Sequence, residues 1–212
     1  MHKIVQQIQT RFKWFQIILI CEIIYSILSP ILNQLFKSDI LQNQSTQVFG
    51  IFDLVTSSVL TVLFYTYFGM LTHGIFNYLK INKNSEVDPN WSVWSIFMPF
   101  ANEILVSLNA KKGYEALNLE TTTPSQYFRY AIFSLITSFF LLITIFYYTL
   151  LTLSRSSSDS ILQKPFGTSF VISVGLTILI FISNYFQWKI MKEMKNAIVA
   201  DSLQADVEFM VE

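Results

Sequence analysis

The chain has 212 residues, of which 52% are hydrophobic and only 13% are charged, whereas an ordinary soluble domain carries roughly 25% charged residues. This shortage of charge predicts an all-α integral membrane protein. The zero net charge and the scattered basic residues argue against a nucleic-acid-binding surface, and the single cysteine, Cys21, excludes an internal disulfide or a thiolate metal cluster.

Four stretches are long and apolar enough to cross the membrane, since a helix needs about 20 residues for roughly 30 Å of hydrocarbon. We expect these transmembrane helices at about residues 14–32, 48–79, 127–153 and 166–188, within one domain that covers residues 1–212. The first span closes at Pro30 and is expected to be uncleaved, because no small-x-small site follows it. Residues 189–212 are expected to extend the fourth helix into the cytoplasm and to fray at an acidic end.

The segment 91–108, between the second and third spans, is as long as a span but holds Pro99 near its middle. Proline removes one helical hydrogen bond, and a broken helix survives at membrane depth only where protein or a wet cavity covers it. The apolar residues of the segment recur at helical spacing, which also describes an amphipathic helix in the membrane interface. We therefore expect a Pro-broken helix that is either re-entrant or interfacial.

The distribution of Lys and Arg chooses between topologies, because short cytoplasmic loops are enriched in both residues. If residues 91–108 do not cross and the N-terminus is cytoplasmic, eleven basic residues lie inside and three lie outside; if they cross, the split is seven to seven. Only the four-span arrangement has a bias, so we expect both termini in the cytoplasm. The eleven are Lys3, Arg11, Lys13, Lys80, Lys83, Lys111, Lys112, Arg129, Lys189, Lys192 and Lys195.

A further pattern runs from a helix that ends near an Asn, through a Pro-x-Trp and more aromatics, to an aromatic-x-Pro-x-x-Asn element. Its positions here are Asn77, Pro89, Trp91, Trp94, Phe97, Pro99 and Asn102. The pattern resembles a bacterial four-helix membrane family known as the domain of unknown function DUF4328. The resemblance implies a location in the bacterial cytoplasmic (inner) membrane, and it implies no activity.

This chain departs from the family at two positions. Glu103 begins the stretch where family members often have a second proline, and His73 is the nearest counterpart of an arginine that many members carry late in the second helix. Whatever those residues do in relatives is therefore not transferred to this chain.

Two acidic residues stand out because charge inside a membrane is costly. Glu22 lies within the first span, where it is either a proton or cation site or a neutral side chain hydrogen-bonded to Tyr, Ser or Thr of a neighbouring helix. Asp53 lies near the outer end of the second span, where we expect a solvated or helix-start role.

A polar stripe is expected on the second helix, since Gly69, His73, Asn77 and Lys80 follow one another at spacings of four, four and three. This stripe predicts a cytoplasmic vestibule formed by His73, Asn77, Asn102, Glu103 and Arg129. The alternative is that these groups only satisfy the backbone that Pro99 leaves unpaired.

Catalytic, cofactor and metal motifs are not recognisable in the sequence, which favours a protein that is not an enzyme. The first functional hypothesis is a non-catalytic accessory, scaffold or assembly subunit that contacts the bilayer and a protein partner or a second copy. The second hypothesis is a small oligomeric channel or a proton- or cation-coupled transporter that uses Glu22 and the vestibule. The two hypotheses make different predictions for Glu22, whose side chain should face a hydrated path only if the protein is a channel or transporter.

Overall fold

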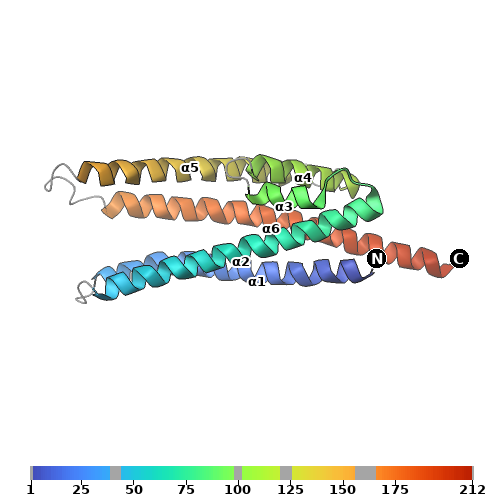
Figure 1. Ribbon diagram of the computed structural model, residues 1–212, viewed down its shortest axis with the longest axis horizontal. Coiled ribbons are helices and arrows are strands. Elements are labelled where there is room, and N and C mark those ends of the chain that lie inside the picture. The colour runs from blue at the N-terminus through green and yellow to red at the C-terminus, as the bar shows by residue number, and fades with distance from the viewer. Residues whose placement is uncertain (1, 39–43, 98–101, 120–125, 156–165, 212) are drawn as a thin grey trace.

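The computed structural model describes residues 2–38, 44–97, 102–119, 126–155 and 166–211, which form six helices and no strand. These are α1 (His2–Ser38), α2 (Gln44–Lys83), α3 (Pro89–Phe97), α4 (Asn102–Ala116), α5 (Gln126–Arg155) and α6 (Phe166–Val211). Four long helices alternate in direction, and the short α3 and α4 lie at the end of the bundle that also holds both termini (Figure 1). The predicted all-α class is confirmed for these residues.

The first helix runs further than the sequence suggested. We expected the first span to close at Pro30, but α1 continues through it to Ser38, because proline costs one hydrogen bond and its flanking residues still favour a helix. The tail beyond residue 189 was expected to extend the fourth helix and to fray at an acidic end, and α6 does extend, as far as Val211.

Asparagine residues end α2 and α4. Asn84 and Asn118 have φ values of 50° and 54°, in the left-handed region that a short polar side chain tolerates. After this reversal the Ser85 N–H donates to the Leu79 carbonyl at 3.2 Å, and the Leu119 N–H donates to the Tyr114 carbonyl at 2.9 Å. The last carbonyls of both helices are satisfied in this way, so each helix stops sharply.

The segment around Pro99 forms two helices, α3 and α4, separated by residues 98–101, which lie outside the described part of the chain. The two helices contact each other, and α3 also contacts α2 while α4 contacts α5. The Asn109 side-chain amide donates to the buried Ser95 hydroxyl at 3.0 Å and ties them together. A Cβ atom at Gly113 would collide with Met194, so this glycine permits a close approach of α4 to α6.

The buried core occupies the half of the bundle near the termini. Its aromatic centre is formed by Phe15, Phe64 and Phe68, with the Phe15 ring centroid 5.6 Å from each of the other two. Met194 and Ile198 of α6 are fully buried in the same cluster. Rings at such separations add attraction beyond the area they bury, so this cluster fixes the packing of α1 on α2.

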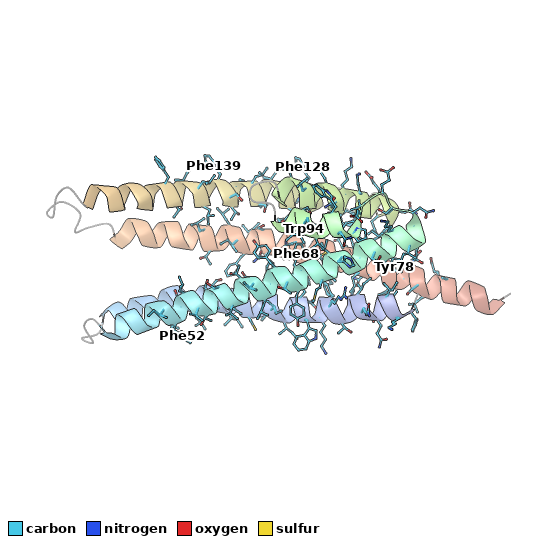
Figure 2. The ribbon with its side chains drawn as sticks, in the orientation of Figure 1. Phe52, Phe68, Tyr78, Trp94, Phe128 and Phe139 are labelled. Carbon is cyan, nitrogen blue, oxygen red and sulfur yellow. The ribbon has the colours of Figure 1, made fainter. Side chains whose placement is uncertain are left out.

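The outer surface is apolar along much of the bundle. Leu54 and Phe139 are 69% and 63% exposed, and Figure 2 shows Phe139 on the outer side of α5 while Phe68 and Tyr78 lie within the bundle. His2–Ser29 and Ile51–Lys83 are long and apolar enough to cross a membrane, and the most apolar stretch of each is only 22% buried. Phe128–Thr144 is a shorter apolar helix. Within the part of the chain that the structure describes, no further helix is both long and apolar enough to cross a membrane.

Polar contacts fasten the end of α6 to its neighbours. Asp201 accepts hydrogen bonds from the Tyr78 hydroxyl at 2.8 Å and from Lys83 Nζ at 2.5 Å, both on α2. Glu193 accepts one from the Tyr114 hydroxyl of α4 at 2.8 Å. Burial of Asp201 opposes its ionisation, but the bonds from Lys83 and Tyr78 and the charge of Lys83 prevail and lower its pKa below the ordinary 3.8.

Replacing Asp201 with Asn should lower the free energy of unfolding by about 1 kcal/mol, because one charge-assisted hydrogen bond is lost at a partly exposed site. The folded pKa of Asp201 lies below the unfolded one, so this contribution is complete above pH 3.8 and fades as the pH falls further. Denaturant unfolding of the parent and Asp201→Asn in detergent across this pH range measures it.

Glu86→Gln is the matched control, because Glu86 is 89% exposed and lies 3.9 Å from Lys112 Nζ, a pair expected to contribute little. Equal losses in the two variants, or an Asp201→Asn effect that does not shrink at low pH, would contradict the proposed fastening of α6.

Candidate functional site

A polar cavity of about 400 Å³ lies in the centre of the bundle. All six helices contribute to its wall, which combines polar side chains with apolar ones that include Phe64 and Phe68. Its polar lining consists of Glu22, Thr61, Tyr65, Tyr130, Ser134, Thr137, Ser138, Ser183, Asn184 and Gln187. Hydroxyl and carboxamide groups gathered around one carboxylate form a site for a small polar or charged guest.

Among the described side chains, Glu22 is the one carboxylate in the cavity wall. Its Oε2 atom is buried and accepts no hydrogen bond from the part of the chain that the structure describes. A buried polar oxygen without a partner is costly, so its persistence points to a water, a proton or a bound ligand at this position.

The remaining polar wall comes mainly from α5 and α6. Ser134, Thr137 and Ser138 recur at three and four residues on α5, and Ser183, Asn184 and Gln187 do the same on α6. The Ser183 hydroxyl lies 3.4 Å from the Ser134 hydroxyl across the two helices. Sequence reasoning missed these residues, although a polar stripe within the uncharged stretch 166–188 of α6 was a signal that the sequence contained.

Asp53 differs from its expectation. It lies more than two turns inside α2, which begins at Gln44, and it does not stand at a helix start. Its Oδ1 accepts hydrogen bonds from the Tyr25 hydroxyl at 2.5 Å and the Ser29 hydroxyl at 2.6 Å, both on α1. Asp53 therefore links α1 to α2, and it is not among the residues that line the Glu22 cavity.

The expected vestibule is only partly assembled. His73 lines a second cavity of about 440 Å³ that also contains Arg11, Asn90 and Trp94. Asn77 is half-buried on α2, and Arg129 is exposed on α5, which contacts α4 and α6. The side chains of Asn102 and Glu103 lie outside the described residues. Among the described side chains, Arg11 and Asn90 lie in the groove with His73, whereas Asn77 and Arg129 do not line it.

The motif residues near α3 have mostly local roles. Pro89 starts the helix, a position that suits a residue without an N–H, and the Trp91 N–H donates to the Asp88 carboxylate at 3.3 Å. Trp91 and Trp94 are 46% and 66% exposed. Pro99 and the side chain of Phe97 lie outside the described residues. Exposed indoles near one end of a bundle are typical of a membrane interface.

Metal-binding chemistry finds no support in the described residues, where no three His, Cys, Asp or Glu side chains gather. The cavity contributes one carboxylate and several neutral oxygens instead. This composition suits protonation or the binding of one small cation.

Comparisons with protein families, curated proteins and solved structures gave no match to this chain. The resemblance to DUF4328 therefore stays a prediction that rests on the residues from Asn77 to Asn102. The assignment of function depends on the geometry of the cavity.

Proposed function

We propose that the protein is a multi-pass membrane protein with four transmembrane helices and both termini in the cytoplasm. The exposed apolar side chains on α1, α2, α5 and α6 support this, because soluble monomers rarely expose large continuous apolar surfaces. The helix directions also bring the eleven basic residues toward the end that holds both termini (Figure 1). That grouping agrees with the excess of Lys and Arg on cytoplasmic sides.

The α3–α4 hairpin lies at the same end, and in this proposal it forms the cytoplasmic cover of the bundle. Trp91 and Trp94 then stand at headgroup level. The cover closes the cavity from the cytoplasmic side, since Ile96 of α3 and Val106 of α4 belong to its wall.

The function we propose is the binding and passage of a proton or a small monovalent cation, in a channel or an ion-coupled transporter. The observation that carries it is the buried, unpartnered Oε2 of Glu22 in a polar cavity. An ionisable residue inside a membrane bundle is by default a functional candidate.

The charge balance favours a monovalent guest. A calcium ion takes six to eight oxygen ligands, typically with several carboxylates. Among the described side chains, Glu22 is the single carboxylate that lines this cavity, and a proton or a single positive charge would neutralise it. Serine, threonine and carboxamide oxygens nearby could replace part of a hydration shell, in the way that neutral oxygens do in ion pathways.

The geometry around Glu22 supports the scaffold hypothesis less than it supports an ion pathway. It predicts a dry contact between Glu22 and a neighbouring helix, whereas the side chain lines a cavity with nine other polar residues. Four spans are few for a carrier, so we expect a second copy to complete the assembly in the membrane.

The topology is tested by single cysteines placed at Lys112, Ala205 and Ser157 in a Cys21→Ser background. We expect positions 112 and 205 to resist an impermeant thiol reagent in intact cells, because they lie in the cytoplasm, and position 157 to react. Permeabilised cells are the control, in which all three should react. Labelling at 112 but not at 157 would invert the proposed topology.

The role of Glu22 is tested by flux into liposomes with an interior pH dye under an imposed Na⁺ or K⁺ gradient. We expect the parent to move protons or cations and Glu22→Gln to lose at least about tenfold of that flux, since the single charge that binds the guest is gone. Glu22→Asp should retain part of it.

Asp53→Asn is the matched control, because it removes the other carboxylate of the apolar region and leaves the cavity wall unchanged. An inactive parent, or equal flux in the parent and Glu22→Gln, would exclude this function.

A further inference from the structure

The second cavity, called here the Arg11 groove, is formed by α1, α2 and α3 near the end that holds the termini. Its volume is about 440 Å³, and its polar groups come from Arg11, Tyr65, Thr66, His73 and Asn90, with Trp94 at its side. Figure 2 places Trp94 on α3, beside α2. The groove is distinct from the Glu22 cavity, although Tyr65 lines both.

Arg11 is held in a fixed place in this groove. Its Nη1 donates a hydrogen bond of 2.8 Å to the Met70 carbonyl of α2. The missing side chain of Gly74 makes room for it, because a Cβ atom there would lie 3.1 Å from Nη1. A guanidinium has five N–H donors, and the bond to Met70 uses one of them.

No described residue balances the positive charge of Arg11. Among the described residues, Arg11 forms no salt bridge, and His73 makes no hydrogen bond. Asp88, which immediately precedes α3, lies 3.5 Å from Lys80 and is not part of the groove wall. The groove therefore offers a preorganised cation, an imidazole and the Asn90 carboxamide, with no carboxylate among its described lining residues.

The position of the groove suggests where its guest comes from. In the proposed topology Arg11 precedes the span that begins at about Trp14, and the exposed indole of Trp94 marks the membrane interface. The phosphates of the cytoplasmic leaflet lie at this depth, and that leaflet is rich in anionic lipid.

We propose that the Arg11 groove binds a phosphate ester, with the guanidinium of Arg11 as its main anchor. The planar fork of arginine matches two phosphate oxygens, and such charge-assisted pairs are stronger than neutral hydrogen bonds. His73 of α2 and Asn90 of α3 supply further donors to the same groove. The ester is either the headgroup of an anionic lipid or a soluble phosphate that enters from the cytoplasm. The proposal rests on the membrane placement above and is independent of the role of Glu22.

Native mass spectrometry of the purified protein in neutral detergent tests this binding with short-chain phosphatidylglycerol as the probe. Arg11→Gln should weaken the affinity by at least about tenfold, because it removes the charge and the fork together. His73→Ala should weaken it by about threefold, and this second variant spares the hydrogen bond to Met70. Glu22→Gln should bind the lipid as the parent does.

The matched control is Lys13→Gln, which removes the same charge from an exposed position two residues away on α1, outside the groove wall. It should change the affinity by less than about twofold, since an exposed charge is screened. Competition with inorganic phosphate separates the two sources of the ester. If inorganic phosphate displaces the lipid from the parent but not from Arg11→Gln, the groove binds a soluble phosphate. If inorganic phosphate displaces no lipid, the groove binds the lipid headgroup. Equal weakening by Arg11→Gln and Lys13→Gln, or binding unaffected by both Arg11→Gln and His73→Ala, would overturn the proposal.

Discussion

The separation of charge along the bundle is the constraint on which the rest of the structure depends. Among the described side chains, the charged residues lie toward the end that holds both termini, and the exceptions are Glu22 and Asp53 (Figure 1). These two carboxylates have different surroundings. Asp53 is satisfied by the hydroxyls of Tyr25 and Ser29 and joins two helices, whereas Glu22 faces a cavity. Because an unsatisfied carboxylate in an apolar bundle is costly, the cavity and its polar walls belong to the explanation of the fold as well as of the function.

The charged end gives the bundle its rigidity. Fully buried aromatic and aliphatic residues pack there, and Asp201 and Glu193 fasten α6 to α2 and α4. Gly113 lets α4 approach Met194 closely, and Asn109 joins α4 to Ser95 of α3. These contacts hold the α3–α4 hairpin beside the cavity, so residues outside the cavity wall position the helices that form it. The exposed apolar surface on the other half needs no such fastening if lipid covers it.

Periodicity and charge were sufficient to predict the helical class of the described residues and the approximate position of the long helices, whereas the role of Glu22 stays a prediction. They could not predict contacts between helices, because a helix pattern shows which face is apolar and leaves open which residue of the neighbour lies opposite. Asp53 and Tyr25 are 28 residues apart, and Arg11 and Met70 are 59 apart, so their pairing depends on the relative shift of α1 and α2. The continuation of α1 through Pro30 was missed because a local helix breaker was weighed without the helix packed beside it. The polar stripes of Ser134 and Ser183 were readable and were overlooked beside the rarer charged residues.

The most direct test of the account is whether water reaches the Glu22 cavity inside a bundle that lipid surrounds. Ser183→Cys and Ile178→Cys, each in a Cys21→Ser background and reconstituted in lipid, place a thiol in the cavity wall and on the exposed apolar side of the same helix. A small cationic thiol reagent should label position 183 and not position 178, because thiolates form only where water enters and the Glu22 carboxylate attracts the cation. Labelling of position 178 but not 183 would contradict the account, since the outer surface would then be wet and the cavity dry.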